Sequence, residues 1–400
     1  IKDADGQLLD VKASYLIACD GGRSPVRKQL GIEMVGSSFS SRWLVVDTDQ
    51  DDDPFWQTRV YCDARRPVVE VPGPHHTRRF EFQLKSGETD AQVLSPECLH
   101  TLLRPFKGDA PVSIVRKTVY TFHARVAERW QVGRVFLAGD AAHLTPPYAG
   151  QGMNSGVRDA HNLGWKLIAV LKGQMAATAL LSYESERRDH AWALIKLALN
   201  LGVVMAPATV LRARLISAAF ALIGLVPPLR DYFLQMRFKP KPRFTKGLVL
   251  PEGKAGKLAC GQMFPQPLLT DAQGHTQLLD TTIGAGFALI QYGDPALQRL
   301  DELRHGLWDH LEAKRILILP AHVQALPSLP GCTVLHDRED ALKDLLGDSH
   351  TFVLLRPDRY VAAIFDLATQ DQAAGALQSL FGITLTNHRV DQPAMAPVYP

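Results

Sequence analysis

The spacing of hydrophobic and polar residues changes several times along this 400-residue chain, and each change marks a different kind of element. Between residues 32 and 130, short alternating or β-branched runs are separated by turn residues, a pattern that is typical of a β-sheet. The predicted strands cover 42–49, 58–63, 67–72 and 78–84, and one or two more cover 112–124. A short helix is expected at 95–106. We therefore predict a sheet domain at 32–130.

A helical period replaces this alternation after residue 150. Apolar side chains recur at helical spacing from 153 to 171. On the same segment the small residues recur every four positions, at Gly152, Gly156, Ala160 and Gly164. Residues four apart share one face of a helix, so this stripe lets a neighbouring backbone come close. A second helix is expected from about residue 177, after a glycine that ends the first.

Residues 194–229 are strongly apolar but include Lys196, Arg212 and Arg214. The uninterrupted apolar run, roughly 15 residues, is shorter than the ~20 that a membrane-spanning helix needs. We predict no membrane span here, and instead buried helices or a subunit interface, which would make a homodimer. Contact with a membrane surface is the alternative.

A basic, proline-containing linker at 239–247 precedes the last part of the chain. From 258 to 390, strands alternate with helical patterns, which predicts an α/β sandwich. No CxxC motif accompanies it, so we expect a stability or dimerisation module without redox activity. The whole chain is predicted to be α/β (α+β), with segments at 1–31, 32–130, 131–245 and 258–390.

Composition excludes some classes of function. With 46% hydrophobic residues, a chain of this length can bury more than one core. The net charge of +3 gives no case for binding nucleic acid or an anionic membrane. The five cysteines are scattered, with neither a disulfide framework nor zinc spacing, which fits reduced thiols in the cytoplasm.

The candidate chemistry is concentrated at 133–154. A short apolar strand there ends at Gly139-Asp140, where an α/β sheet places a carboxylate against a ribose or ribityl hydroxyl. The corner that follows, and the start of the helix, contain Pro146, Pro147, Gly150, Gly152, Met153 and Asn154. Prolines fix the backbone, and the free N–H groups at a helix start suit an anion or an electron-rich ring.

Two strings of the chain, one in this region and one near its start, resemble motifs of one family. GDAAHLTPPYAGQGMN at 139–154 resembles the second flavin motif of the class A flavoprotein aromatic hydroxylases, the para-hydroxybenzoate hydroxylase-like family. DGGRSPVR at 20–27 resembles the Asp-Gly motif of the same family. The resemblance implies FAD and NAD(P)H as cofactors. It also implies a partial FAD-binding Rossmann-like domain, a mixed-sheet substrate domain and a C-terminal thioredoxin-like domain.

In the first of these motifs along the chain, the resemblance implies that Asp20, beside Gly21, accepts a hydrogen bond from a ribityl hydroxyl. Arg23 and Arg27 would offer charge to the dinucleotide phosphates. Two simpler interpretations stay open. Asp20 can be a helix N-cap, and the two arginines can belong to a solvated helix face.

In the second motif, the resemblance implies that Asp140 binds a flavin hydroxyl. The N–H groups of Met153 and Asn154 would bind the flavin pyrimidine edge and steady its reduced anion. Pro146 and Pro147 would form the wall beside the flavin and the oxygen site.

The implied reaction is hydroxylation of a phenolic acid, such as 3-(3-hydroxyphenyl)propionate, with NAD(P)H and O₂. A polyketide or other phenol hydroxylase is the alternative enzyme, and a non-catalytic remnant without stable FAD is the alternative from another class. No catalytic base is assigned. His143 is expected to pack in its turn, His75 and His76 lie in a predicted loop, and Arg79 and Glu81 lie on a strand of which one face meets the substrate.

The G-x-G-x-x-G string that seats the FAD pyrophosphate in this family does not occur in the sequence. The nearest string, at 284–286, lacks the third glycine, and the chain starts inside a predicted hairpin that turns at Asp5-Gly6. We therefore expect an N-terminal truncation of on the order of 100 residues or more. By itself, the 400-residue chain is expected to bind FAD weakly or not at all.

Overall fold

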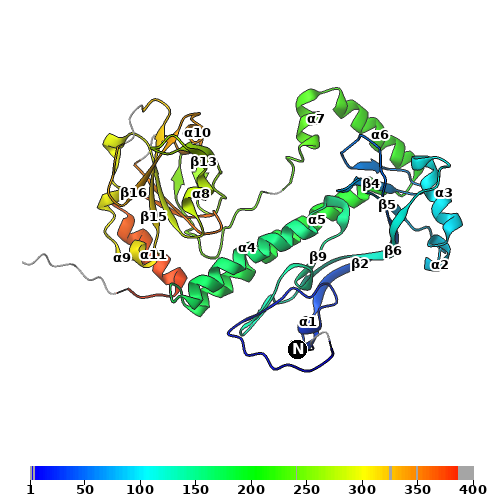
Figure 1. The fold of residues 1–400 in the computed structure, drawn as a ribbon, viewed down its shortest axis with the longest axis horizontal. Helices are drawn as coiled ribbons and strands as arrows, with labels where there is room; N and C mark the ends of the chain where they lie inside the picture. The colour runs from blue at the N-terminus through cyan, green and yellow to red at the C-terminus, as the bar shows by residue number, and fades with distance from the viewer. Residues whose placement is uncertain (1, 3–4, 240, 324–326, 348–349, 386–400) are drawn as a thin grey trace, which may run out of the picture. The chain divides into compact units, whose positions relative to one another are not determined.

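The computed structural model describes residues 2, 5–239, 241–323, 327–347 and 350–385. It divides into two compact units (Figure 1). Unit 1 contains residues 1–158 and 188–240, and unit 2 contains residues 159–187 and 241–400. The division falls inside two long helices, α4 (Gly152–Leu171) and α5 (Ser182–Met205), so each of them contributes residues to both units.

The larger sheet of unit 1 is antiparallel and has the strand order β3-β4-β5-β2-β6-β9. Its strands are β2 (Met34–Thr48), β3 (Arg59–Tyr61), β4 (Val68–Pro72), β5 (Arg78–Gln83), β6 (Ile114–Ala127) and β9 (His143–Leu144). The predicted strands are confirmed, and the segment expected to hold one or two strands at 112–124 is the single strand β6. β2 begins eight residues before the predicted start, at Met34 rather than Arg42.

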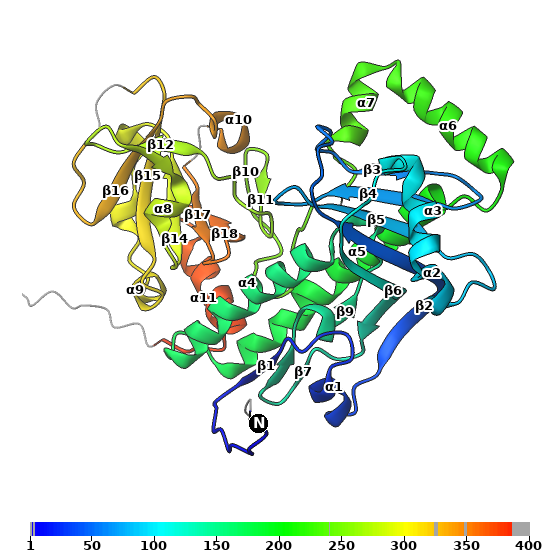
Figure 2. The same cartoon turned by 45° about the vertical axis from the view of Figure 1, so that its right-hand side comes forward.

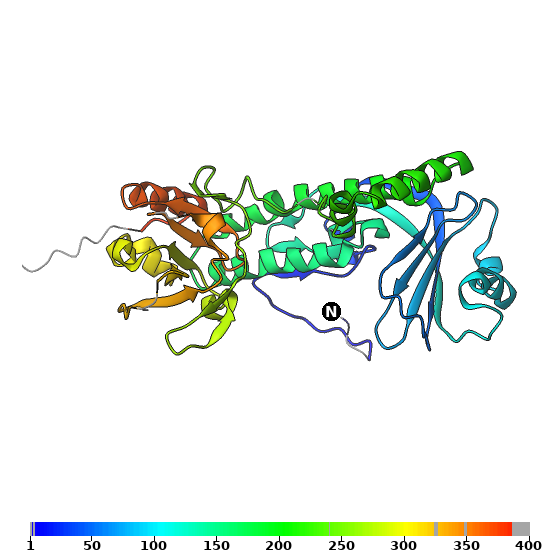
Figure 3. The ribbon, with the colours of Figure 1, turned by 90° about the horizontal axis from the view of Figure 1, so that it is seen from above.

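Alternation along β5 sorts its side chains between the two faces of this sheet. Phe80 and Phe82 are buried on one face, where they pack against Leu99 and Leu103 of α3 (Pro96–Lys107). Figures 2 and 3 show α3, which follows the short helix α2 (Asp90–Val93), against this face. The intervening residues of β5 therefore point to the opposite face, where the candidate site lies.

The smaller sheet of unit 1 brings the two sequence motifs together. β1 (Leu16–Ala18) pairs in parallel with β8 (Val135–Leu137), and β7 (Gln131–Val132) pairs with the other edge of β8. Parallel strands end at the same edge of a sheet, so the segments after β1 and β8 meet there. Of the hairpin predicted before β1, the described residues show one antiparallel bridge, between Lys2 and Leu8.

The apolar segment at 194–229 forms the end of α5, then α6 (Val210–Gly224) and α7 (Pro227–Leu234). The prediction of buried helices is wrong for α6 and α7, which bury none of their residues within the described chain. Apolar side chains occur all round these helices, and Leu211, Leu222, Leu225 and Leu234 are each more than 60% exposed. In the described residues no single helix is long and apolar enough to cross a membrane. One pair, residues 177–205 with α6, passes on length and composition but is bent by 107°.

Unit 2 is built on a seven-stranded mixed sheet with the order β13-β12-β16-β15-β14-β17-β18. Its strands are β12 (Leu268–Thr270), β13 (Thr276–Leu278), β14 (Ala288–Tyr292), β15 (Lys314–Pro320), β16 (Cys332–Asp337), β17 (Phe352–Leu355) and β18 (Val361–Phe365). The three strands β14, β15 and β16 are parallel, and the others pair antiparallel. A hairpin of β10 (Lys254–Ala255) and β11 (Leu258–Ala259) precedes this sheet.

Each face of this sheet has its own core, because neighbouring residues of a strand point to opposite faces. On β14, Leu289 belongs to one core and Ile290 to the other. The helices around them are α8 (Leu279–Ile283), α9 (Gly306–His310), α10 (Lys343–Leu346) and α11 (Gln370–Phe381). This arrangement is the α/β sandwich predicted for 258–390, of which residues 324–326, 348–349 and 386–390 lie outside the described part.

Residues 159–187 belong to this sandwich, although the sequence grouped them with the cofactor segment at 131–245. Trp165, Ala169 and Met175 pack in the core of the face that α11 covers. The Trp165 ring meets Phe287 edge to face, with 5.6 Å between ring centres. Large aromatic contacts of this kind dominate core energetics, so this half of α4 is anchored in unit 2.

Candidate active site

The second flavin motif forms an exposed corner on unit 1. The strand β8 ends at Leu137 and is followed by the buried Ala138. Gly139 then takes a left-handed backbone with φ 58°, and the Asp140 side chain is exposed. A second left-handed residue, Gly150 (φ 59°, ψ 31°), turns the chain into α4. These two positions need glycine, because other residues rarely adopt a positive φ.

The start of α4 presents its backbone to open space. No described atom lies within 4 Å of an ideal Cβ placed on Gly150 or Gly152, and the Met153 side chain is 80% exposed. Asn154 is exposed as well. The first four N–H groups of a helix have no partner within the helix, so this end can donate hydrogen bonds to a ligand.

A close backbone approach fixes α4 against the motif. A Cβ atom added to Gly156 would lie 3.3 Å from the Cα atom of Gly139. That distance is tighter than ordinary van der Waals contact between carbon atoms. The stripe of small residues predicted on this helix therefore serves, at Gly156, to bring the helix start beside Asp140.

The first motif lies next to the second through Arg27. Its guanidinium is buried and donates to the carbonyl oxygens of Ala141 and Gly22, both at 2.9 Å. Burial lowers the pKa of Arg27, and the nearby Asp20 carboxylate opposes that effect. These bonds favour a structural role for Arg27, which holds the two motifs together, whereas Arg23 is exposed and remains a candidate for phosphate contact.

Asp20 is exposed at the start of α1 (Pro25–Gln29). The residue that caps this helix is Ser24, which accepts from the Arg27 N–H at 2.9 Å, while Asp20 accepts from the Val26 N–H at 3.1 Å. Partial burial opposes ionisation, but the hydrogen bonds from Ser24 and Val26 outweigh it and lower the pKa of the Asp20 carboxyl. Asp20 is therefore an ionised acceptor beside the half-buried Gly21, at the same sheet edge as Asp140.

These residues fit the riboflavin half of FAD. One opening of about 520 Å³ is bordered by Asp140, Gly150, Gly152 and Met153 from the motif, and by the sheet on its other side. An acceptor for a hydroxyl and free backbone donors for a ring edge thus face one space. Pro147 also borders this opening, whereas Pro146 is buried and does not border it.

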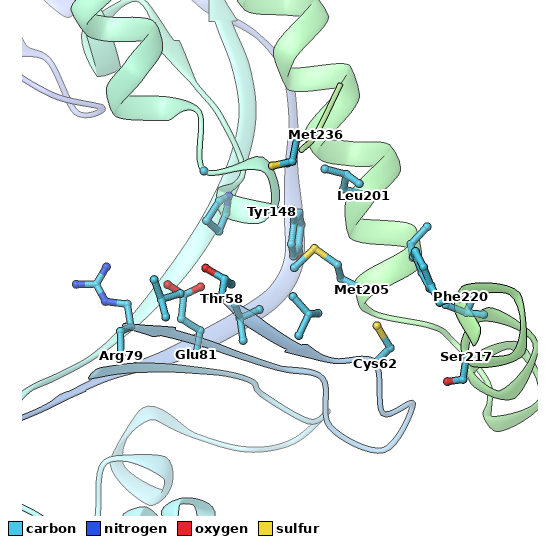
Figure 4. Close-up of a pocket in the computed structure, with 17 residues that line it drawn as sticks. Thr58, Cys62, Arg79, Glu81, Tyr148, Leu201, Met205, Ser217, Phe220 and Met236 are labelled. Carbon is cyan, nitrogen blue, oxygen red and sulfur yellow. The ribbon is translucent and has the colours of Figure 1, made fainter. Parts of the chain in front are cut away.

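An apolar pocket of about 830 Å³ lies beside this opening, entirely within unit 1 (Figure 4). Strands β3, β4 and β5 form one wall, and α5 and α6 contribute Leu201, Val204, Met205, Ile216 and Phe220 to the other. Four residues border both spaces: Arg79, Glu81, Pro147 and Gly150. The pocket therefore begins where the flavin corner ends.

The ring of Tyr148, inside the flavin motif, also lines the pocket. It meets Trp43 and Phe122 edge to face, with centre distances of 5.8 and 6.0 Å. Burial raises the pKa of Tyr148 to about 12, so this phenol stays protonated at neutral pH. The motif itself carries Tyr148, but its position beside α5 was not predictable from local sequence.

The charged residues of the pocket come from β5. Arg79 donates from Nε and Nη2 to the two carboxylate oxygens of Asp47, at 2.7 and 3.0 Å. Glu81 is half-buried, and burial raises the pKa of its carboxyl while Arg79 opposes that effect. Arg79 and Glu81 are two positions apart on β5 and therefore lie on the same side of the sheet. That side faces the pocket.

The histidines contribute little to this site. His143 is fully buried and stacks on Trp130 with 5.4 Å between ring centres, which is the packing role expected for it. His75 and His76 are exposed in the loop before β5 and do not line the pocket.

Comparisons with known proteins place this site in a family. Residues 1–198 match the family described as the FAD binding domain, and residues 261–380 match the HcaD C-terminal domain. A 3-(3-hydroxy-phenyl)propionate/3-hydroxycinnamic acid hydroxylase of Klebsiella pneumoniae strain 342 is 39% identical over 371 residues, covering 91% of this chain and 66% of the relative. The enzyme of the same name from Escherichia coli K12 is 39% identical over 391 residues, covering 96% and 70%. The chain thus spans about two thirds of the length of these relatives.

Solved structures show the same fold. An aklavinone-11 hydroxylase in complex with FAD and aklavinone gives a TM-score of 0.70 at 24% identity, over 95% of this chain and 70% of that one. An anhydrotetracycline hydroxylase from Streptomyces rimosus gives 0.65 at 27% identity, over 92% and 69%. The relatives at 39% identity show that the chain belongs to the FAD-dependent aromatic hydroxylases, the family that includes the 3-(3-hydroxyphenyl)propionate hydroxylases.

Proposed function

We propose that this protein is a monooxygenase that uses FAD, NAD(P)H and O₂ to hydroxylate a phenolic acid of the 3-(3-hydroxyphenyl)propionate type. One observation carries the proposal: Pro147 and Gly150 border both the opening at the flavin motif and the apolar pocket. A ring held in that pocket would lie next to a flavin held at the corner. The names of the Klebsiella and Escherichia relatives support the substrate class.

Bound FAD supplies the redox chemistry, because it takes electrons from NAD(P)H and passes them to O₂. The residues of this chain bind and orient it. Asp20 and Asp140 would accept hydrogen bonds from the ribityl chain, and the N–H groups of Met153 and Asn154 would donate to the pyrimidine edge. Donors at that edge stabilise the negative charge of the reduced ring.

The apolar pocket would hold the substrate ring and exclude water. Most of its lining side chains are apolar, with valine the most frequent, and its far wall is provided by α5 and α6. Exclusion of water strengthens polar interactions inside the site and protects reactive species from hydrolysis. Pro147 would keep the passage between ring and flavin rigid, because its φ is fixed.

The test is a steady-state assay of the full-length protein supplied with FAD. We expect 3-(3-hydroxyphenyl)propionate to speed NAD(P)H oxidation and to yield a catechol, with NADH and NADPH compared in parallel. The matched control is 3-phenylpropionate, which lacks the ring hydroxyl and should yield no catechol. If no phenolic acid speeds the oxidation and none is hydroxylated, the proposed substrate class is wrong.

A bulkier phenol is the second candidate substrate. The pocket volume is near the upper end of the range for small-molecule sites, about 300–1,000 Å³, so a polycyclic ring system would fit. Arg79 is the one cationic side chain among the described residues that line the pocket, and it is already paired with Asp47. The carboxylate tail of a phenolic acid would therefore find no free cation there. A polycyclic phenol that is hydroxylated in the same assay, while phenolic acids are not, would favour this candidate.

We also propose a cytoplasmic location and a homodimeric assembly. All five cysteines are free thiols, which agrees with a reducing, cytoplasmic location. The exposed leucines of α6 and α7 support a homodimer, because large exposed apolar surfaces are commonly covered in an assembly. Sedimentation analysis of the full-length protein decides the assembly, and a monomer at all concentrations would contradict it.

A further inference from the structure

Glu81 is an unusual residue for its position. It lies in the middle of β5, between Val45 of β2 and Val69 of β4 in the sheet register. Its carboxylate faces the apolar pocket, and it also borders the opening at the flavin corner. Figure 4 shows the Glu81 carboxylate and the Thr58 hydroxyl rising from the sheet toward the side on which Tyr148 lies.

The surrounding protein does not account for this carboxylate. Among the described residues Glu81 makes no hydrogen bond and no ion pair, although burial raises the pKa of its carboxyl. The groups that act on its charge are Arg79, which Asp47 already binds through both oxygens, and Asp47 itself. An unpartnered carboxylate in an apolar site costs free energy. That cost is offset if a ligand brings a hydrogen-bond donor.

A phenol is a donor of the right kind. Its hydroxyl is a strong hydrogen-bond donor, and its proton lies within reach of a carboxylate whose affinity for protons burial has increased. A neutral amine or amide of a ligand could also donate a hydrogen bond to Glu81. That contact would not make a ring of the ligand more reactive. Loss of the phenolic proton pushes electron density onto the ring carbons beside the hydroxyl, which makes them better nucleophiles.

We propose, on the basis of the function proposed above, that Glu81 accepts the phenolic proton of the substrate and thereby orients the ring. The phenol O–H bond breaks as the Glu81 O–H bond forms. After the ring has gained oxygen, its carbon-bound hydrogen leaves as a proton, and the Glu81 proton returns to the product oxygen. The overall reaction takes phenol, O₂, NAD(P)H and one proton to the diphenol, NAD(P)⁺ and water, so Glu81 is unchanged.

The same contact explains which ring carbon reacts. Glu81 borders both spaces, as Pro147 and Gly150 do, so a hydroxyl at Glu81 places the adjacent ring carbon next to the flavin corner. The rest of the substrate would then extend toward Met205 and Phe220 on the helix side of the pocket. Glu81 thus selects hydroxylation beside an existing hydroxyl group.

The test uses 4-nitrophenol as a probe of the pocket. Its phenolate is yellow, so the colour reports whether the hydroxyl of the bound probe has lost its proton. The full-length protein is titrated with pH in the presence of the probe, as wild type, Glu81→Gln, Glu81→Asp and, as a matched control on the exposed surface, Glu128→Gln. Two adjacent negative charges repel, so the bound probe should turn yellow at higher pH in wild type than in Glu81→Gln. Glu81→Asp and Glu128→Gln should keep the wild-type value.

Turnover supplies a second readout. Glu81→Gln should lower kcat at least tenfold with a smaller change in KM, and part of the loss should return as pH rises and the substrate ionises by itself. A wild-type protein that fails to bind the probe, or one that shows the same probe titration as Glu81→Gln, would overturn the role of Glu81. A shifted probe titration without hydroxylation of any phenol would support Glu81 as the acceptor and overturn the proposed function alone.

Discussion

Arg356 and Glu186 form a two-pronged ion pair in the interior of unit 2. Nη1 of Arg356 lies 2.7 Å from Oε1 of Glu186, Nη2 lies 2.8 Å from Oε2, and both side chains are fully buried. Asp358 accepts from the same guanidinium, and Lys166 of α4 donates to Glu186 at 2.8 Å. Two cations and two carboxylates therefore balance, and they join α4, α5 and the segment after β17.

Removal of Arg356 should destabilise this unit strongly. Arg356→Met leaves two buried carboxylates against Lys166 alone, and breaking a buried ion pair in this way costs about 3–5 kcal/mol. The measurement is urea unfolding of the full-length protein, followed by tryptophan fluorescence. The control is Arg299→Met, because Arg299 pairs with Glu302 at the surface and should change stability by less than about 1 kcal/mol. Equal effects of the two substitutions would contradict the assignment.

The same cluster predicts a dependence of stability on pH. Burial would raise the pKa of Glu186, but the charges of Arg356 and Lys166 outweigh burial and bring it to about 2. The unfolded chain, with a glutamate pKa of about 4.3, takes up the proton first as pH falls. Glu186 therefore contributes stability above about pH 4.3, and this contribution, on the order of 3 kcal/mol, is lost as pH falls toward 2.

Urea unfolding at a series of pH values from neutral to about 3 checks this sign. Other carboxylates titrate in the same range, so the comparison is between wild type and Glu186→Gln. The variant cannot ionise at this position and should lose less stability on acidification. Parallel losses in both proteins would show that Glu186 does not have a lowered pKa.

Local patterns were enough to predict much of the fold. Alternation and turn residues located β3, β4 and β5, because each strand has one face in a core, as Phe80 and Phe82 show. The flavin corner was predictable for a different reason. Left-handed turns need glycine at positions such as Gly139 and Gly150, and the close approach at Gly156 excludes a side chain. The geometry of the corner therefore requires particular residues at fixed spacing, and these are visible in the sequence.

Features that depend on distant contacts were not predictable. Nothing in the sequence around Trp165 or Glu186 indicates that these residues pack with Phe287 and Arg356, more than 100 positions away. The helix wall of the pocket was not predictable for the same reason, because the composition of α6 predicts a buried helix. Its apolar residues instead face the pocket at Ile216 and Phe220 and solvent elsewhere.

Gly156→Ala should weaken FAD binding. The added methyl group would lie 3.3 Å from the Cα atom of Gly139 and would push α4 away from the corner that carries Asp140. We expect at least a tenfold rise in the Kd for FAD, because displaced donors lose their alignment with the ring. Gly164→Ala is the matched control on the same helix, since no described atom lies within 4 Å of its new Cβ.

Fluorescence titration of FAD with the full-length proteins gives both values of Kd. Gly164→Ala should leave FAD binding unchanged and stabilise the helix by about 0.5–1 kcal/mol, because alanine is the better helix former. If Gly156→Ala also leaves the Kd unchanged, the backbone contact between α4 and Gly139 is not needed to shape the flavin site.

Asp140→Ala tests the predicted acceptor of the flavin hydroxyl. Asp140 is exposed and borders the opening at the corner, so its loss should not affect folding. A hydrogen bond to a charged group contributes about 1.5–3 kcal/mol, which corresponds to a Kd for FAD at least tenfold higher. Asp140→Asn keeps one acceptor oxygen and should lose less. Because the alanine variant should keep the melting temperature of the FAD-free wild type, a weaker Kd can be assigned to the lost contact. An unchanged Kd would mean that Asp140 does not bind the flavin.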